Sequence, residues 1–454
     1  MKKSNFAIFD EIISEITKVY LHDNRPWLIG YSGGKDSTLL VSLVFQAIAQ
    51  IPEKKRTKKT YIITSDTLVE NPFVKEYMHK SSKNINIASN SQKLNIEAHI
   101  IYPEDHQTFW SRVIGLGYPT PEPPGFRWCT ERLKINPMNK FVNDCIKVNG
   151  EIIILLGVRK AESLARSRSI SEKQISGYLL NPHNNINNAY VYNPLTEIDN
   201  SLVWEYLLKN DGISPWGSNM KELFSLYQGE SLGEEQSVIG EIDEKKIPIT
   251  GNSRFGCWCC TLVKEDKSLQ SFINKGYTEL IPLREFRNWL VSIRQDSNFR
   301  ETKRRNGTVY TKANGETGFG PFSLNARSEI LKRLLLLQRE TNLELITIAE
   351  LKAIDEMWDN DGDLYRRNLV NIYFEVTGKH LPWDDYKASL FHPEIVTEIK
   401  TIANKYSVEP ELMEKLIVSV NTNKHFTRSN AIKKDFNRII NQEWLHQNLL
   451  SEER

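Results

Sequence analysis

The stretch WLIGYSGGKDSTLL, residues 27–40, decides the fold class of this chain. It runs from an apolar segment through a pair of glycines into a second apolar segment, and this order predicts a strand, a tight turn and a helix. Backbone N–H groups in such a turn can close on an anion, and the N-terminus of the helix adds a partial positive charge. Lys35 adds a full charge. A Walker A loop is excluded, because only three residues separate Gly30 from Gly34 and Asp36 follows Lys35.

The composition is that of a soluble globular protein. The 454 residues are enough for two or three domains, and 40% of them are hydrophobic and 26% charged. No apolar run has the length that a bilayer requires, and residues 1–20 lack the charged-then-apolar order of a signal peptide. We therefore expect a cytoplasmic protein. The formal net charge of +2 is low for a free-standing DNA-binding domain, so any contact with nucleic acid has to come from local patches or from partners.

Apolar runs and helical segments alternate through the first half of the chain. The strand-like runs lie at residues 27–31, 61–65, 98–102, 152–156 and 190–192. Alternation of this kind predicts an α/β fold with a parallel sheet covered by helices on both faces. Ligands of such sheets bind at the carboxyl ends of the strands, where the glycine turn and Asp66 both fall.

Changes in composition divide the chain into four expected segments. They are an α/β domain at 1–227, a linker or flap at 228–252, a cysteine-containing and basic Gly-rich region at 253–323, and a helical C-terminal domain at 324–454. Within the first segment, the Ser- and Asn-rich residues 165–190 are predicted to form a surface loop.

Three charged side chains near strand ends are candidates for contacts with a phosphorylated ligand. Asp66 could meet a ribose or a metal on its phosphates, with a helix N-cap before Pro72 as the alternative interpretation of its segment, residues 66–72. Arg159 and Arg166 follow the fourth strand, and each can present a guanidinium fork to phosphate oxygens. The alternative for both arginines is a solvated helix start.

The five cysteines are Cys129, Cys145, Cys257, Cys259 and Cys260, and their odd number and wide spacing argue against structural disulfides. Cys257 and Cys260 form a C-x-x-C pair, which suits a metal or cluster, a redox dithiol or a persulfide carrier. Zinc would need two more ligands and no His lies nearby, whereas an iron–sulfur cluster can recruit the distant Cys129. Cys145 lies on the apolar stripe of a helix expected to begin with Asn136 as its cap, so it is either a core thiol or a further ligand.

A basic, Gly-rich segment with interleaved aromatic residues precedes the helical region. Its residues suit the phosphate backbone of a nucleic acid, with a solvated surface as the alternative. They are Arg300, Lys303, Arg304, Arg305, Lys312 and Arg327, with Tyr310 and Phe319 among them.

The SGGKDS turn resembles the PP-loop of ATP pyrophosphatases, which split ATP into AMP and pyrophosphate. Over roughly residues 25–265 the motifs follow the order of the phosphoadenosine phosphosulfate reductase family. The pairing of Arg127-Trp128-Cys129-Thr130 with GCWCCT at residues 256–261 is similar to the DndC-like sulfurtransferases of bacterial DNA phosphorothioation. This resemblance implies an ATP pyrophosphatase with a [4Fe–4S] cluster, a cysteine desulfurase as sulfur donor, Dnd-type partner proteins and DNA as acceptor. Mg²⁺ would bridge the ATP phosphates, as is usual for such chemistry.

The resemblance also implies roles for individual residues. The nucleotide-binding set is Ser32, Gly33, Gly34, Lys35, Asp36, Ser37, Asp66, Arg159 and Arg166, and within it Lys35, Asp36 and Arg159 are the expected catalytic residues. The cluster ligands implied by the motifs are Cys129, Cys257 and Cys260. Family members that bear a cluster have adjacent cysteines where this chain has Trp128-Cys129, so the fourth ligand is Cys145 or Cys259, and we expect Cys145.

The expected reaction is adenylation of a DNA phosphate oxygen followed by its replacement with sulfur. A sulfonucleotide reductase is the first alternative, but such an enzyme needs a nucleophilic cysteine near its C-terminus, and the last cysteine here is Cys260. A tRNA thiolase and a DNA-binding subunit that only senses ATP are the remaining alternatives.

Overall fold

The computed structural model describes residues 7–123, 126–160, 178–227, 256–305, 308–309, 311, 315–361, 368–384, 393–408, 410–422 and 429–443. Contacts divide the chain into two compact units, Met1–Pro103 with Pro121–Ile281, and Glu104–Thr120 with Pro282–Arg454. The linker expected at 228–252 lies outside the described residues, as do Arg166, Tyr310 and Lys312. The four segments expected from the sequence therefore stay a prediction.

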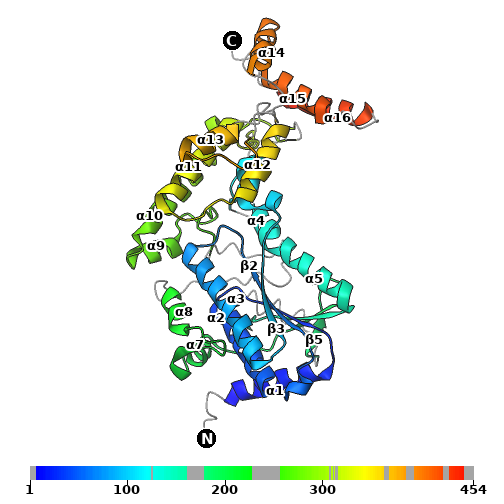
Figure 1. Cartoon of the computed structure of the whole chain (residues 1–454), viewed down its shortest axis with the longest axis vertical. Coiled ribbons are helices and arrows are strands. Elements are labelled where there is room, and N and C mark those ends of the chain that lie inside the picture. The colour runs from blue at the N-terminus through cyan, green and yellow to red at the C-terminus, as the bar shows by residue number, and fades with distance from the viewer. Residues whose placement is uncertain are drawn as a thin grey trace. The chain divides into compact units, whose positions relative to one another are not determined.

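A mostly parallel sheet forms the centre of the first unit (Figure 1). Its strands are β1 (Trp27–Gly30), β2 (Thr60–Ser65), β3 (Ile96–Ile101), β4 (Ile152–Leu155), β5 (Leu180–Pro182) and β6 (Ala189–Tyr192). They lie in the order β3-β2-β1-β4-β6-β5, and every neighbouring pair is parallel except β5 with β6. The α/β fold predicted from the sequence is confirmed.

The short strand β5 corrects the part of the expected loop at residues 178–190, whereas residues 165–177 lie outside the described residues. Leu180–Pro182 pairs antiparallel with β6, and the intervening Asn-rich residues close the hairpin. A three-residue strand has too few side chains to show an alternating pattern, so its pairing with β6 defines it. Pro182, which has no N–H to donate, is tolerated because β5 is an edge strand.

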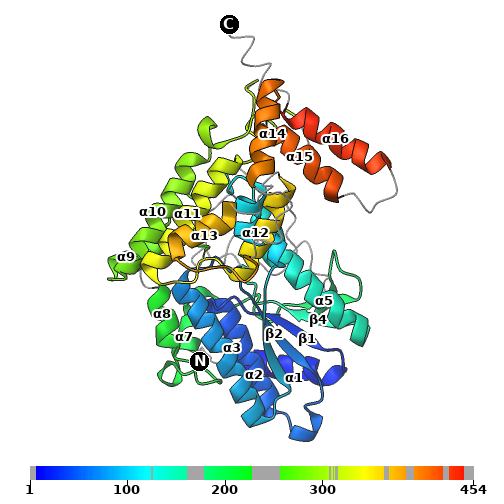
Figure 2. The ribbon, with the colours of Figure 1, turned by 45° about the horizontal axis from the view of Figure 1, so that its top comes forward.

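Helices cover both faces of this sheet, as Figure 2 shows. On β1, Trp27 and Ile29 point into one core, which they share with the helices at residues 7–22, 35–50 and 200–207. Leu28 points into another core, which it shares with the helix at residues 136–149. This alternation follows from the two-residue period of a strand. The helices of the unit are α1 (Ala7–His22), α2 (Lys35–Gln50), α3 (Pro72–Gln92), α4 (Trp128–Thr130), α5 (Asn136–Asn149), α7 (Asn200–Leu207), α8 (Met220–Tyr227) and α9 (Lys267–Asn274).

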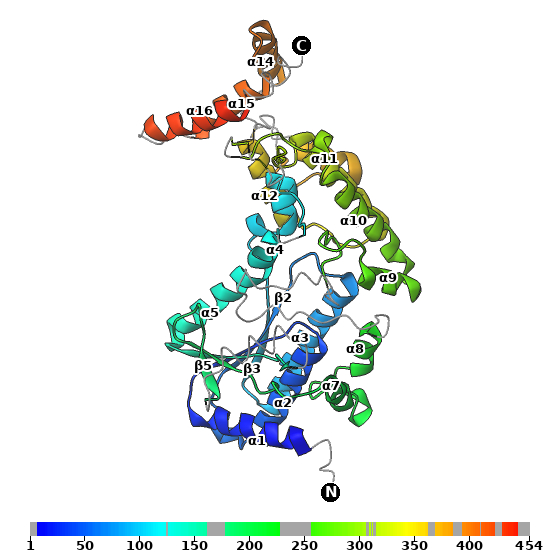
Figure 3. The same ribbon diagram turned by 180° about the vertical axis from the view of Figure 1, so that it is seen from behind.

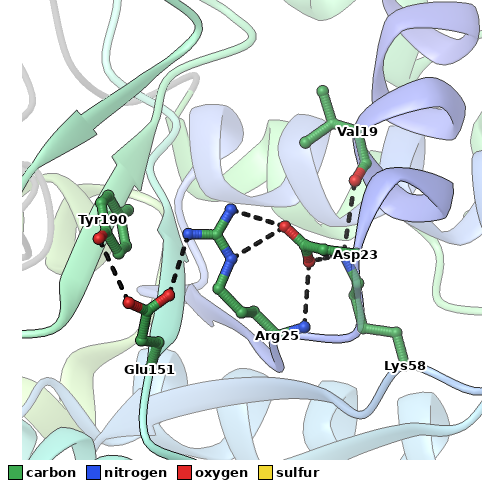
Figure 4. A network of polar contacts seen from close by, with 6 residues as sticks. All are labelled: Val19, Asp23, Arg25, Lys58, Glu151 and Tyr190. Atoms are coloured by element: carbon green, nitrogen blue, oxygen red, sulfur yellow. Dashed lines mark hydrogen bonds and ion pairs between the residues drawn. The ribbon is translucent and has the colours of Figure 1, made fainter.

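A buried lysine, Lys58, forms polar contacts at the amino ends of the strands (Figure 4). Lys58 precedes β2 and is only 2% exposed. Its ammonium donates to Asp23 Oδ1 at 3.0 Å and to the carbonyl of Val19 at 3.4 Å, and it lies 4.9 Å from the ring centroid of Trp27. Burial lowers the pKa of Lys58, and the ion pair with Asp23 offsets part of this shift.

The network continues across the strands through Arg25. Its guanidinium donates to Asp23 Oδ2 at 2.6 Å and lies 3.3 Å from Glu151 Oε2, while Tyr190 donates to the other oxygen of Glu151. Partial burial would raise the pKa of Asp23, but the hydrogen bonds from Arg25 and Lys58 outweigh it and lower that pKa. The amino ends of β1, β2 and β4 are thereby joined by paired charges, and β6 is joined to them by the hydrogen bond from Tyr190.

Helices build the second unit, which can be followed in Figure 3. They are α10 (Ile281–Ile293), α11 (Leu324–Thr341), α12 (Ile348–Asn360), α13 (Asn368–Thr377), α14 (Pro393–Lys405), α15 (Pro410–Thr422) and α16 (Ser429–Glu443). The helical region predicted from Leu324 onward is confirmed, and the Ser323 side chain caps α11. None of the helices in the described part of the chain is both long and apolar enough to cross a lipid bilayer.

The segment Glu104–Thr120 belongs to this helical unit although it follows β3 in the chain. Trp110 donates its indole N–H to the carbonyl of Leu345 at 2.9 Å, and Trp358 donates to the carbonyl of Ile114 at 2.8 Å. Both indoles are fully buried. The two tryptophans therefore tie the early segment to the helices that come more than 200 residues later.

The Lys58–Asp23 pair makes a prediction about stability. Asp23→Asn should lower the free energy of unfolding by about 2 kcal/mol, because Lys58 keeps a buried charge without a full counter-charge. Lys58→Met removes that charge, so Asp23→Asn should cost less in the Lys58→Met background than in the wild type. Urea denaturation of the four proteins measures the difference. Equal costs in both backgrounds would contradict the pairing.

The pH dependence of the same pair can be checked independently. Because the folded-state pKa of Asp23 is lowered, its ionised form contributes stability that is fully present above the unfolded pKa of about 4. This contribution is lost as the pH falls through the lower folded pKa. The stability difference between wild type and Asp23→Asn should therefore shrink as the pH falls from about 5 to about 2. A difference that stays constant over this range is the contrary result.

Candidate nucleotide and thiol site

The glycine turn, residues 32–37, leads from β1 directly into α2. Helix α2 begins at Lys35, and among the described residues no side chain caps it at Gly34. Ser37 Oγ donates to the carbonyl of Gly34 at 3.0 Å and lies 3.2 Å from Ser32 Oγ, so the turn is closed by its own hydroxyls. The N–H groups at the start of a 16-residue helix then face the turn, which is the arrangement that binds phosphate.

Two glycines allow this turn to pack closely against its neighbours. Gly33 has φ +74°, and a Cβ there would lie 2.8 Å from Met78 Cγ on α3. A Cβ on Gly157, after β4, would lie 3.0 Å from the carbonyl oxygen of Asp36. The turn is thus held between α3 on one side and the end of β4 on the other, and a side chain at either position would displace it.

A buried ion pair joins the turn to the end of β4. Arg159 Nε donates to Asp36 Oδ1 at 2.7 Å, and its Nη1 donates to the carbonyl of Ile198 at 3.1 Å. Arg159 is fully buried, and Lys35 Nζ lies 3.4 Å from the other oxygen of Asp36. The three predicted catalytic residues are therefore brought together. In this arrangement Arg159 supports the turn through Asp36, and its predicted phosphate contact stays a prediction.

Asp66 lies at the end of β2 and is fully buried. Its Oδ1 accepts from the N–H of Leu68 at 2.8 Å, and its Oδ2 lies 2.8 Å from His79 Nε2. Asn71, rather than Asp66, caps α3, because its side chain accepts from the N–H of Phe73. The helix cap expected before Pro72 is therefore Asn71, and the contact of Asp66 with a ribose or metal stays a prediction.

The cysteine loop, residues 256–261, is fastened to the segment that follows β2. The N–H of Trp258 donates to the carbonyl of Val69 at 3.0 Å, and Cys257 pairs with Glu70 in an antiparallel bridge. The indole of Trp258 is 1% exposed and anchors the loop. Thr261 Oγ1 donates to the carbonyl of Pro121 at 2.6 Å. The C-x-x-C pair is thereby held at the carboxyl end of β2, the strand beside β1.

Cys129 lies in the first turn of a helix. The sequence had predicted that this helix begins at Asn136, which would have left Cys129 outside it. The helix starts at Trp128 and continues through a π-helical turn, Glu131–Ile135, into α5. Ile135 keeps helical dihedral angles (φ −70°, ψ −49°), so Asn136 is an interior residue and no cap. π-Helical turns within α-helices are rare and frequent at functional sites.

Four of the five thiols influence one another. Burial and the neighbouring Cys260 raise the pKa of Cys129 to about 11. Burial raises the pKa of Cys259 well above its ordinary value, and the thiols of Cys257, Cys260 and Cys129 raise it further. Cys259, which is fully buried, is thus the thiol that accompanies the three predicted ligands.

Cys145 lies elsewhere, in the apolar core between α5 and the sheet. Its companions there include Leu28, Ile63, Met138 and Val142, and it is 9% exposed. Among the thiols of the chain, it contributes to none of the shifts described for the others. The core alternative considered for Cys145 matches this position, and its predicted ligand role has no support from it.

Lys134 and Glu70 are charged residues near the thiols that the sequence reasoning did not single out. Lys134 Nζ lies 3.1 Å from Glu70 Oε1, which also accepts from Thr67 Oγ1. Burial alone would lower the pKa of Lys134, but Glu70 and the Cys257 thiol raise it above its ordinary value. Only their pairing across more than 60 residues of sequence identifies them.

The donor chemistry of this thiol set is that of an iron–sulfur site, because thiols from two segments influence one another's pKa and Lys134 influences them as well. In the described residues, no three His, Cys, Asp or Glu side chains stand in positions that would hold a metal ion as they are.

The basic segment of the second unit uses several of its arginines internally. Arg300 Nε donates to the carbonyl of Gly320 at 2.9 Å, and Arg305 and Arg327 each donate to Asp361 at 2.8 Å. These contacts stabilise the helical unit. The predicted contact of the segment with a nucleic acid stays a prediction.

The placement of the thiols can be tested by comparing two single variants. Cys259→Ala should lower the amount of iron bound per chain after anaerobic reconstitution severalfold, because it removes a thiol from the set. Cys145→Ala, the matched control, should leave the iron content unchanged, since that thiol lies in the apolar core. Iron and sulfide analysis measures both. Loss of iron in the control variant alone would restore Cys145 as the ligand.

Comparison with known proteins gives the following likenesses. Residues 26–263 match the model of the phosphoadenosine phosphosulfate reductase domain. An uncharacterized protein of Methanocaldococcus jannaschii is 25% identical over 174 residues, which are 37% of this chain and 30% of that protein, so the chain spans about a third of this relative's length.

Two solved structures also resemble the chain. A phosphoadenylyl-sulfate reductase from Candida auris in complex with phosphate is 14% identical, with a TM-score of 0.29, and covers 52% of this chain and 97% of its own. The U34-tRNA thiolase NcsA from Methanococcus maripaludis with its [4Fe–4S] cluster is 17% identical, with a TM-score of 0.28, and covers 48% and 72%.

The family match extends over more than half of the chain, and it includes both the glycine turn and the cysteine loop. The chain belongs to the phosphoadenosine phosphosulfate reductase domain family.

Proposed function

We propose that this protein is an ATP-dependent sulfurtransferase, which adenylates an oxygen of its acceptor and replaces that oxygen with sulfur. The observation that carries the proposal is the attachment of the cysteine loop beside the glycine turn. Trp258 and Cys257 pair with Val69 and Glu70 at the end of β2, and the turn follows the adjacent β1. The same edge of the sheet thus carries the glycine turn and the cysteine loop.

The glycine turn would bind the phosphates of ATP. Its N–H groups and Lys35 would stabilise the negative charge that develops on the departing pyrophosphate. Asp36 and Arg159 would keep the turn in shape through their buried ion pair. Mg²⁺ held on the phosphates themselves would neutralise further charge. The acceptor oxygen attacks the α-phosphorus, pyrophosphate leaves, and the acceptor becomes adenylated.

A persulfide of the sulfur donor would deliver sulfur to the adenylated acceptor, because the four thiols near the turn are assigned to the cluster. The terminal sulfur of that persulfide attacks the activated phosphorus, and AMP leaves with the oxygen. A second thiolate of the donor then attacks the inner sulfur, so that the transferred sulfur keeps the electron pair of the broken S–S bond and the two donor thiols form a disulfide.

A [4Fe–4S] cluster would be held by Cys129, Cys257 and Cys260, with Cys259 as the fourth thiol in preference to Cys145. When bound, it would supply iron sites held by thiolates, whose potential depends on the surrounding charges. Lys134, with Glu70 as its partner, would be one such charge.

DNA is the acceptor that we propose, with a cysteine desulfurase as sulfur donor and Dnd-type proteins as partners. The support is the resemblance of the paired motifs around Cys129 and Cys257 to the sulfurtransferases of DNA phosphorothioation. A sulfonucleotide and a tRNA are the competing acceptors within the same chemistry.

The nucleotide products test the first half of the reaction. Purified protein with ATP, Mg²⁺ and DNA should form AMP and pyrophosphate, and Lys35→Ala should lower the rate by about 100-fold because a charge stabiliser is lost. Lys54→Ala is the matched control, since Lys54 is an exposed lysine outside the turn. Chromatography of the nucleotides measures the products. Formation of ADP would refute the proposal.

The acceptor is tested by supplying DNA, tRNA and a sulfonucleotide separately, with a cysteine desulfurase and labelled cysteine. Label in digested DNA, as a phosphorothioate dinucleotide found by mass spectrometry, is the expected outcome. Label in tRNA alone, or release of sulfite from the sulfonucleotide, would overturn DNA as the acceptor.

A further inference from the structure

A strained turn follows β2 and precedes α3. Leu68 has φ +67°, a left-handed conformation that is uncommon for a residue with a branched side chain. Such a conformation persists only where the surroundings enforce it, and it is enriched at functional sites. The turn therefore needs a local restraint.

Asp66 supplies this restraint. Its Oδ1 accepts from the N–H of Leu68 at 2.8 Å, which fixes the peptide that enters the strained residue. Its Oδ2 lies 2.8 Å from His79 Nε2 and 4.0 Å from Lys75 Nζ, both on α3. The carboxylate is fully buried, so these contacts are little weakened by water.

The residues on either side of Leu68 hold the thiol-bearing segments. The carbonyl of Val69 accepts from Trp258, and Glu70 pairs with the backbone of Cys257. Thr67 Oγ1 lies 3.7 Å from Cys257 Sγ, and it donates to Glu70. The contacts between this turn and the cysteine loop thus come from Thr67, Val69 and Glu70, which all lie within two residues of Leu68.

Helix α3 connects the same carboxylate to the glycine turn. Met78, the residue before His79, lies so close to Gly33 that an added Cβ would stand 2.8 Å from its Cγ. Asp66 is therefore joined through adjacent residues of α3 to the phosphate-binding turn and through Leu68 to the cysteine loop.

We propose that Asp66 is a positioning residue that holds the cysteine loop against the nucleotide edge through the turn at Leu68, and that it is not a ligand of the nucleotide. The proposal rests on the proposed function for its purpose, but its geometry stands without it. A carboxylate with a protein partner on each oxygen, buried from solvent, is suited to fixing the backbone and poorly suited to exchanging partners with a substrate.

Two measurements on the full-length chain test the assignment: the dissociation constant for ATP, and the rate at which the thiols react with an aromatic disulfide reagent in metal-free protein. Asp66→Ala should raise the thiol reaction rate about tenfold, because the cysteine loop loses its support. The same variant should change the dissociation constant for ATP by less than about twofold.

A second substitution provides a rescue that a nucleotide ligand would not show. Glycine adopts φ +67° without a steric cost, so Asp66→Ala with Leu68→Gly should return the thiol rate toward that of the wild type. Leu68→Gly alone, the matched control, should react no faster than the wild type. A double variant that reacts as fast as Asp66→Ala would overturn the role of the turn.

Asp66→Asn keeps an oxygen for the N–H of Leu68 and serves if the alanine variant does not fold. Its thiol rate should stay within about threefold of the wild type. Weakened ATP binding with an unchanged thiol rate, in either variant, would make Asp66 a nucleotide ligand and overturn the proposal. That outcome would leave the proposed function intact. If the wild-type protein forms no AMP and pyrophosphate, the proposed function is refuted, but the thiol rates still test the positioning role.

Discussion

The ion pair between Asp36 and Arg159 joins the segments that follow β1 and β4. From β1 the chain continues to strands on one side of the sheet, and from β4 it continues to strands on the other side. Asp36 lies in the first turn of α2, after β1, and Arg159 follows β4 on the other side of the point where the strand order reverses. Ligands of doubly covered parallel sheets bind at such a reversal, because the loops on its two sides diverge and leave space. A buried pair across the reversal sets the separation of the two loops. The glycine turn, the approach of Gly157 and the packing of α3 all depend on that separation.

The parts of the fold that rest on local pattern could be read from the sequence. Strands buried on both faces are continuous apolar runs, so β1 and β4 were recognisable, and the glycine pair marked the start of α2. Strand β5 could not be recognised, since only its pairing with β6 distinguishes it from a loop. The start of the helix at Trp128 was missed because Asn136 and Pro137 imitate a helix cap, while the backbone stays helical through them.

The candidate site shows the same division. The turn and the C-x-x-C pair are contiguous motifs, and they were found. Glu70 and Lys134 are separated by more than 60 residues, and their relation to the thiols exists only once β2 and the helix after Trp128 are folded. The sequence could not decide whether Cys145 or Cys259 belongs with the other thiols, because both are buried. Cys145 lies among aliphatic side chains, whereas the pKa of Cys259 is influenced by three other thiols.

Glu104–Thr120 belongs to the helical unit although the sheet unit precedes and follows it in the chain. This arrangement determines where the protein can be cut into separately expressed fragments. A chain ended after Ile281 would keep Trp110 and Ile114 but lose their partners Leu345 and Trp358. A fragment beginning at Pro282 would lack the same two indole contacts from the other direction. The boundary between the units is therefore not a single position in the chain, and a clean separation needs a short replacement for the 104–120 segment as well as a cut near residue 281.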